Sequence, residues 1–158
     1  MDNKEGKREI ELKLIRIQET GFYINTEELS KVGEIQEADL NIKLGFKIDL
    51  QLENDLFILH LRVNYNYKKD GVNLEILELL IANSFKIKSL NKLVSISDNE
   101  FKDNAGILPT LMGIAIGTLR GILFTKTIGT VLGDYPLPIM NPTEICNKKK
   151  IENAGGVE

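Results

Sequence analysis

The sequence contains few of the residues from which enzymes build catalytic or metal centres. Among its 158 residues there are one cysteine, Cys146, and one histidine, His60, and there is no tryptophan. A single cysteine excludes an intramolecular disulfide and a cysteine-rich zinc site. His60 occupies a polar position of an alternating segment, where an exposed imidazole is expected, and Cys146 is expected to pack as a small apolar residue. We therefore expect no catalytic residue, no metal site and no cofactor, and hence no enzyme.

The chain also lacks a large excess of either charge. Its 20 basic and 23 acidic residues give a net charge of −3, which does not favour nucleic acid or anionic lipid as a partner. Residues 1–11 are charged and lack the apolar core of a signal peptide, so we expect a cytoplasmic protein. Residues 105–124 form the one long apolar run, but Pro109 near its start and Arg120 inside it favour a buried helix over a membrane span.

The most regular feature of the sequence is an alternation of apolar and polar residues. It runs without a break over residues 38–53, which is typical of a strand that is buried on one face. Residues 57–67 repeat the pattern, and Asn54-Asp55 suits a two-residue turn because both residues tolerate a positive φ. The sequence therefore predicts a hairpin whose apolar residues pair on one face: Leu52 with Phe57, Leu50 with Leu59 and Ile48 with Leu61.

Two further segments complete four predicted antiparallel strands. Asp70-Gly71 is a hairpin-turn pattern that leads into residues 72–88, where a slip in the alternation indicates a bulge near Ile76. The alternation slips in the same way within residues 10–24. Residues 27–37 are expected to be a polar connection between the first two strands.

The main helix is predicted over residues 108–128, with Pro109 in its first turn and Gly129 after its end. Three glycines recur at every fourth position and so lie along one stripe of this helix: Gly113, Gly117 and Gly121. Each glycine costs a helix interior about 0.5–1 kcal/mol relative to alanine. Such a stripe favours the close approach of another element, either the helix's own sheet or a helix of another subunit.

These elements predict an α+β fold, a four-stranded antiparallel sheet with one main helix and a short C-terminal helix packed on one face. Pro136 and Pro138 keep residues 135–139 extended, and Asn141-Pro142 is a helix-start pattern. We expect one domain over residues 1–158, with strands in 8–88, a crossover in 89–107, the main helix in 108–128, an extended segment and short helix in 130–146, and a disordered tail in 147–158.

The predicted sheet is larger than the helix that covers it. Four strands of about 12 residues make a face on the order of 750 Å², whereas a helix about 27 Å long and about 10 Å wide shades on the order of 270 Å². Monomers seldom leave apolar patches above a few hundred Å² unused. We therefore expect subunits to associate, an apolar ligand to bind, or both.

The order of these elements resembles the SecB family of protein-export chaperones. The resemblance covers residues 8–146, and the residues that carry it are Leu108-Pro109, Arg120-Gly121, Gly129-Thr130 and Tyr135-Pro136-Leu137-Pro138-Ile139-Met140-Asn141-Pro142. It implies an ATP-independent holdase that binds unfolded or export-bound polypeptides in apolar grooves. It also implies a cytoplasmic homotetramer, built as a dimer of dimers, that requires no cofactor.

The resemblance further implies where clients and subunits bind. The candidate client-binding residues are Phe85, Ile87, Leu90, Leu93, Val94, Ile96, Tyr135, Leu137 and Ile139. Each of them could equally close the protein's own core. The glycine stripe, Gly113, Gly117 and Gly121, is expected to lie where main helices pack between subunits.

The polar strand faces depart from the family pattern and leave other functions open. Members of the family present an acidic sheet face to the export motor SecA, whereas here Lys43, Lys47 and Arg62 are mixed with Asp39 and Asp49. This mixture argues against SecA as a partner and leaves open a chaperone dedicated to a toxin–antitoxin system. A self-assembling scaffold or adaptor, or a carrier of a small apolar ligand, would also account for the uncovered sheet.

Overall fold

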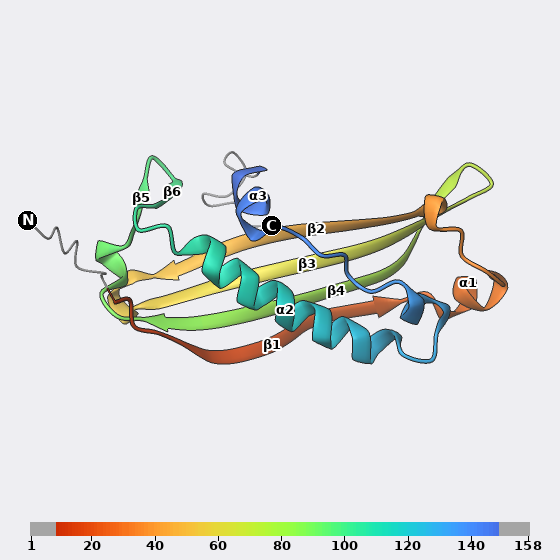
Figure 1. Ribbon diagram of the computed structural model, residues 1–158, viewed down its shortest axis with the longest axis horizontal. Helices are drawn as coiled ribbons and strands as arrows, with labels where there is room; N and C mark the ends of the chain where they lie inside the picture. Colours follow the sequence, from red (N-terminus) through yellow and green to blue (C-terminus); the bar gives the residue numbers. More distant parts are fainter. Residues whose placement is uncertain (1–8, 149–158) are drawn as a thin grey trace, which may run out of the picture.

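The computed structural model describes residues 9–148, and its architecture is a layer of strands with helices packed on it (Figure 1). The strands form one antiparallel sheet in the order β1-β4-β3-β2. Their bounds are β1 (Leu12–Ile24), β2 (Leu40–Gln51), β3 (Leu56–Lys69) and β4 (Val72–Ile87). The predicted α+β class with four antiparallel strands is confirmed, and β1 and β2 are the edge strands.

The two main helical elements lie on one face of the sheet, which we call the helix face; the opposite face is called the open face. α2 (Leu108–Thr127) crosses the helix face diagonally, and α3 (Pro142–Lys148) packs against α2 (Figure 1). The remaining elements are α1 (Thr26–Lys31), β5 (Val94–Ser97), β6 (Glu100–Asp103) and the 3-10 turns η1 (Glu37–Asp39), η2 (Leu52–Asn54), η3 (Leu90–Lys92) and η4 (Val131–Asp134). The β5–β6 hairpin occupies the crossover, whose internal structure the sequence left open.

The β2–β3 hairpin has the predicted faces but a different register. Leu50 lies opposite Phe57 and Ile48 opposite Leu59, so the predicted pairs of Leu52 with Phe57, Leu50 with Leu59 and Ile48 with Leu61 are wrong by two residues. The connection is longer than predicted because residues 52–54 form η2 and Asp55 adopts a left-handed conformation with φ 53°. A shift of two residues keeps each side chain on its face, so the predicted apolar face is retained.

The β3–β4 turn is confirmed. Lys69 pairs with Val72 across Asp70-Gly71. Both turn residues have positive φ, 52° and 77°, as a type I′ turn requires, and this turn matches the twist of the two strands.

Bulges explain the slips in alternation. The neighbouring β3 residues Tyr65 and Asn66 pair with Leu77 and Glu75 of β4. Ile76 is therefore the extra residue of a bulge in β4, as predicted. β1 shifts at two points, between residues 14 and 16 and between residues 19 and 21, and otherwise pairs continuously with β4. A bulge lets a long strand bend while its apolar residues return to the same face.

The core lies between the sheet and α2. On β3 every odd-numbered residue from 57 to 67 is buried and no even-numbered residue from 56 to 68 is. The side of α2 that covers this face carries Leu111, Met112, Ala115, Leu119 and Leu123. By length and composition α2 could cross a membrane, and in the structure it packs on β3 and β4.

The ends of α2 follow the predicted signals. Pro109 lies in its first turn, and Gly129, with φ 81°, follows its C-cap. A third feature, which the sequence did not predict, fixes the start of the helix: the Asp103 carboxylate accepts hydrogen bonds from the backbone N–H groups of Ile107 (2.9 Å) and Leu108 (2.8 Å). These bonds satisfy donors that a helix start would otherwise leave unpaired, and they fix β6 to α2.

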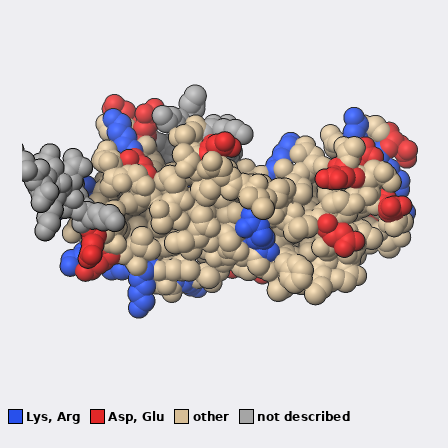
Figure 2. Space-filling view, viewed as in Figure 1, with Lys and Arg blue, Asp and Glu red and all other residues tan. Residues whose placement is uncertain are grey.

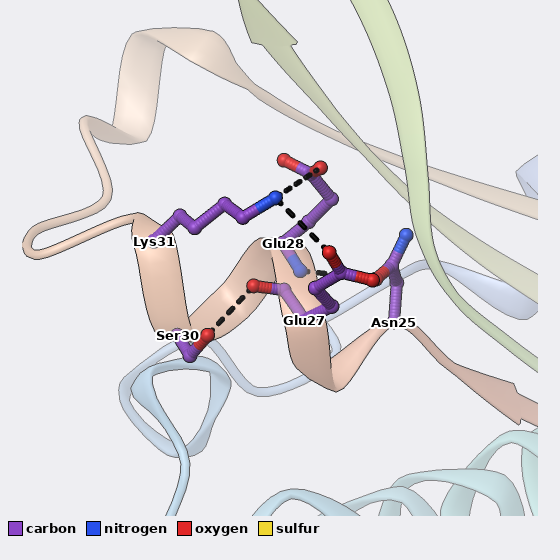
Figure 3. A network of polar contacts seen from close by, with 5 residues as sticks. All are labelled: Asn25, Glu27, Glu28, Ser30 and Lys31. Carbon is purple, nitrogen blue, oxygen red and sulfur yellow. Dashed lines mark hydrogen bonds and ion pairs between the residues drawn. The ribbon is translucent and has the colours of Figure 1, made fainter.

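α1 is a short, self-contained turn of helix between β1 and β2 (Figure 3). The Asn25 side chain accepts a hydrogen bond from the backbone N–H of Glu28 at 3.0 Å, and the Ser30 hydroxyl donates to the Glu27 carbonyl at 2.7 Å. The Lys31 ammonium lies 3.2 Å from the Glu27 carboxylate. This local capping fixes the chain that leads to Ile35.

α3 begins at the predicted signal. The Asn141 side chain accepts a hydrogen bond from the backbone N–H of Thr143 at 3.0 Å. The tail expected over residues 147–158 starts inside α3, and residues 149–158 lie outside the described part of the chain.

Candidate client-binding groove

The helix face of β2 is only partly covered. β2 is an edge strand, and α2 packs on the central strands β3 and β4. On the covered side of β3 the side chains have at most 1% of their surface exposed from Phe57 to Tyr65. On β2, most of the residues that pair with this side of β3 remain half-buried, and these are Leu40, Ile42, Leu44, Ile48 and Leu50. A strip of apolar surface therefore runs along this edge of the sheet.

An extended segment, residues 135–141, forms the other wall of this strip. Its backbone carbonyls are held by side chains from two elements. The Tyr65 hydroxyl of β3 donates to the Tyr135 carbonyl at 2.7 Å, and the Arg120 guanidinium of α2 donates to the carbonyls of Leu137 (3.2 Å) and Pro138 (3.0 Å). Because prolines interrupt this segment, it cannot pair as a strand, and side chains supply the missing partners.

Tyr135 also joins the segment to the polar connection between β1 and β2. Its hydroxyl donates a hydrogen bond to the Ile35 carbonyl at 2.7 Å, and Ile35 is itself 5% exposed. Hydrogen bonds from the Tyr65 and Tyr135 hydroxyls thus link β3 to the extended segment and the extended segment to the residues that follow α1. Burial raises the pKa of Tyr65 to about 12, so its phenol remains a donor at neutral pH.

A pocket of about 490 Å³ opens between β2 and this segment. It is lined by Glu37, Leu40, Ile42, Asp134, Tyr135, Pro136 and Pro138. Its walls present polar and apolar surface in about equal parts, and its carboxylates come from the two 3-10 turns at its edge. Ile139, two residues beyond Leu137, projects from the same segment with 98% of its surface exposed. Together we call these features the β2 groove.

The structure divides the predicted client-binding residues into two groups. Tyr135, Leu137 and Ile139 belong to the extended segment beside β2, although Leu137 itself is 2% exposed. The other group lies at the end of β4 and in the crossover, where Phe85, Ile87, Leu90 and Val94 are 0% exposed, Leu93 is half-buried and Ile96 is 55% exposed. Of the nine predicted client-binding residues, a single protomer therefore exposes to a ligand only Ile96, Ile139 and parts of Leu93 and Tyr135.

Sequence reasoning missed Leu40 and Ile42 as groove residues. Both belong to the predicted apolar face, and nothing in the alternation distinguishes a covered position from an uncovered one. The available signal was topological: in two consecutive hairpins, β2 must be an edge strand if β1 pairs with β4. A single helix laid over the central pair then leaves the outer strand with the least cover.

The glycine stripe faces away from the sheet. A Cβ atom placed on Gly117 or Gly121 would meet nothing within 4 Å, and one on Gly113 would meet only Pro142 of α3, at 3.6 Å. Close packing of the stripe on the protein's own sheet, one of the two expected uses, is therefore wrong. Around the stripe, Ile114 and Phe124 are 36% and 53% exposed, and this side of the molecule is largely uncharged (Figure 2).

His60 and Cys146 do not form a reactive pair. His60 lies on the open face, where its Nε2 atom is 2.7 Å from the Asp49 carboxylate. Cys146 lies in α3 on the opposite side of the sheet, and burial, with a smaller contribution from the Asp103 charge, raises the pKa of its thiol to about 11. A thiol with so high a pKa is a poor nucleophile at neutral pH. No three His, Cys, Asp or Glu side chains within residues 9–148 are grouped to hold a metal ion.

Comparison with solved structures identifies the fold. The chain is similar to the Mycobacterium tuberculosis SecB-like chaperone Rv1957, solved in complex with a ChAD peptide from the Rv1956 HigA1 antitoxin, with a TM-score of 0.50 and 10% identity over 82% of this chain and 88% of that one. A protein of unknown function from Streptococcus agalactiae aligns with a TM-score of 0.40 and 12% identity over 84% and 98% of the two chains. No protein-family model and no curated protein matches the sequence. The chain has a SecB-like fold, and the likeness is one of fold alone.

Proposed function

We propose that this protein is an ATP-independent molecular chaperone, a holdase, that binds unfolded or export-bound polypeptides in the β2 groove. The observation that carries the proposal is the groove itself: in a SecB-like fold, an apolar edge strand stays half-buried beside an anchored segment that exposes Ile139. The peptide bound by Rv1957 supports a polypeptide as the occupant. The proposed activity is binding without an enzymatic step or a cofactor, in the cytoplasm.

The chemistry of the groove suits an extended chain of variable sequence. Burial of apolar surface is non-directional and contributes about 25 cal/mol per Å², so it does not demand one particular side chain. An extended client places every second side chain on the same side, and such a row could lie along Leu40 and Ile42. The segment carbonyls are already bonded to Tyr65 and Arg120, so the wall is formed before the client arrives.

A second candidate is a chaperone dedicated to one toxin–antitoxin partner. The observation that favours it is the antitoxin peptide in the Rv1957 structure. The two candidates differ in selectivity rather than in chemistry. A general holdase binds many unfolded chains, whereas a dedicated chaperone binds one antitoxin segment and leaves unrelated unfolded proteins to aggregate.

We also propose that the chain assembles as a dimer of dimers through the outer side of α2. Gly117 and Gly121 of the stripe are open on that side, and glycine allows two helices to approach closely. Ile114, Phe124 and, on β1, Ile17 supply exposed apolar surface around it. This assembly would cover the outer side of α2 and leave the β2 groove open to a client.

The experiment that tests the holdase compares a groove variant with a matched surface variant. Ile139→Asp places a charge on the segment that forms one wall of the groove, at a side chain that is 98% exposed, and Val72→Asp makes the same change at the β3–β4 turn, where Val72 is 58% exposed. We expect the wild type and Val72→Asp to suppress aggregation of a chemically unfolded reporter at stoichiometric ratio. We expect Ile139→Asp to require severalfold more protein, since a charge that stays hydrated opposes apolar burial.

Four results would contradict this function or redirect it. No suppression by correctly folded wild type would reject a general holdase, and binding of a single antitoxin segment under the same conditions would select the dedicated chaperone. Weak binding of a dye for apolar surface would favour a closed scaffold or adaptor. A lipid retained in native mass spectrometry would favour a carrier of small apolar ligands.

A further inference from the structure

The open face of the sheet carries an excess of positive charge. Cross-strand pairing assigns to it the basic residues Lys13, Arg16, Lys43, Lys47, Arg62, Lys68 and Lys86 and the acidic residues Asp49, Glu75 and Glu78. With His60 neutral, these strand residues have a net charge of +4. Because the whole chain has a net charge of −3, everything outside this set carries −7. The open face therefore has a net charge opposite in sign to that of the chain as a whole.

The carboxylates of the open face are already occupied by neighbours on the same face. Asp49 lies 2.7 Å from His60 and 3.7 Å from Lys47. Glu78 accepts hydrogen bonds from Asn64 (2.9 Å) and from Arg62, and these contacts hold the pKa of its carboxyl below the usual range. Glu75 accepts a longer bond from the same Asn64 amide, at 3.3 Å.

Most of the cations, by contrast, have no carboxylate beside them. Within residues 9–148, no ion pair involves Lys13, Arg16 or Lys43, and Lys86 donates only to the Asn54 carbonyl. Lys13 and Lys86 lie directly opposite each other on β1 and β4. Like charges in that position destabilise a sheet. The fold thus retains an unfavourable arrangement that an incoming anion would relieve.

We propose that the open face is a docking surface for an acidic polypeptide segment that also carries apolar side chains. Its charge is complementary to such a segment, and between the cations lie Ile58 and Leu80, both half-buried on the two central strands. A protein interface combines a central apolar contact with charged residues around it. A nucleic acid fits less well, because three carboxylates interrupt the face and its aromatic rings within residues 9–148 are the single pair Tyr23, on the edge strand β1, and His60, which lies against Asp49.

This surface is separate from the β2 groove. The groove lies on the helix face and the proposed surface on the open face of the same sheet, so one protomer can hold a client and dock a partner together. The open face is therefore suited to bring the protein, with or without its client, to an acidic site on another protein. The inference does not depend on the holdase function, because it uses none of the groove residues.

The test measures binding of a labelled synthetic peptide of Glu-Glu-Leu repeats by fluorescence anisotropy, with a Gln-Gln-Leu peptide as the uncharged control. We expect the acidic peptide alone to bind. We expect binding to weaken between about 10 mM and about 150 mM salt, where the screening length falls from about 30 Å to about 8 Å.

Two matched double variants locate the site: Lys13→Glu with Lys86→Glu on the open face, and Lys92→Glu with Lys102→Glu in the crossover, where both side chains are exposed.

The open-face variant should lose about tenfold in affinity, on the basis of exposed ion pairs worth up to about 1 kcal/mol each, and the crossover variant should bind as the wild type does. Equal loss in both variants would reject the surface, as would no binding of the acidic peptide at low salt. Tighter binding of single-stranded oligothymidylate than of the peptide would assign the face to nucleic acid instead. Salt-sensitive self-association without peptide would assign it to a second copy. Ile139→Asp should leave peptide binding unchanged, which separates this test from that of the groove.

Discussion

At the scale of single residues, Asn83 is the most unusual side chain in the core. It is 0% exposed, it points to the helix face between Ile17 of β1 and Leu59 of β3, and neither of its amide atoms has a hydrogen-bond partner within residues 9–148. An unpaired buried polar group costs about 1–3 kcal/mol. We expect Asn83→Leu, which has a similar size, to raise the free energy of unfolding by about 1–3 kcal/mol in urea titrations. Ser84→Leu on the open face is the control, and a loss of stability in Asn83→Leu would show that the amide is bonded.

Tyr65 makes the stability of the protein depend on pH and anchors the extended segment beside the groove. Its pKa is raised from 10.0 to about 12 by burial, so the unfolded chain ionises this phenol before the folded chain does. Its contribution to stability is therefore complete below pH 10 and is lost as pH rises toward 12. We expect Tyr65→Phe to lower the free energy of unfolding at neutral pH by about 1 kcal/mol, because the Tyr135 carbonyl loses its donor. The same variant should lose less stability than the wild type between pH 10 and 12, whereas Tyr23→Phe, at an exposed tyrosine, should not change the profile.

At the scale of elements, the start of α2 depends on one carboxylate. Asp103 of β6 accepts from two backbone N–H groups of the first turn, and the N-cap residue Ile107 has no side-chain cap of its own. We expect Asp103→Ala to cost about 0.5–2 kcal/mol of stability, as the loss of a helix cap does. Hydrogen exchange at Ile107 and Leu108 should accelerate. Glu100→Ala removes the same charge from the same strand and should change neither, and equal effects of the two variants would show that charge, not capping, matters.

Elements also show what the sequence could predict and what it could not. Asp70-Gly71, Pro109 and Gly129 set backbone geometry by themselves, so the β3–β4 turn and both ends of α2 were predictable locally. The β2–β3 register was not, because Asn54-Asp55 is compatible with a short turn and with the observed longer one. The β5–β6 hairpin was not predicted either. Its turn, Asp98-Asn99, has positive φ at both residues but lies in a polar segment without sustained alternation.

For the groove, too, local backbone geometry was predictable from the sequence and tertiary cover was not. The prolines made residues 135–139 an extended segment in the sequence, and the structure places that segment beside β2. The role of Phe85, Ile87, Leu90 and Val94 depended on whether the crossover covers them or leaves them open. That outcome follows from tertiary packing, including the edge-to-face contact of Phe101 with Phe57 at 5.9 Å. Periodicity gives the buried face of a strand but not the element that covers it.

At the scale of the whole molecule, the decisive question is what meets the outer side of α2. If the protein is a monomer, Gly117 faces solvent, and replacing it should stabilise the helix by about 0.5–1 kcal/mol through helix propensity alone. If helices of two subunits pack at the stripe, a large side chain must separate them, because overpacking a close contact costs about 1–3 kcal/mol. The two cases therefore predict opposite signs for the same substitution.

We expect Gly117→Leu to reduce the assembly to smaller species in sedimentation velocity, and Gly117→Ala to do so less, because its methyl group needs less space. The separated subunits of Gly117→Leu should keep the secondary structure of the wild type, since within residues 9–148 no atom beyond the adjacent turns of α2 lies within 4 Å of the added Cβ. An unchanged sedimentation profile together with increased stability in both variants would exclude the stripe as an interface. The apolar outer side of α2 would then need another partner, and the oligomeric chaperone would lose its main structural support while the β2 groove kept its own.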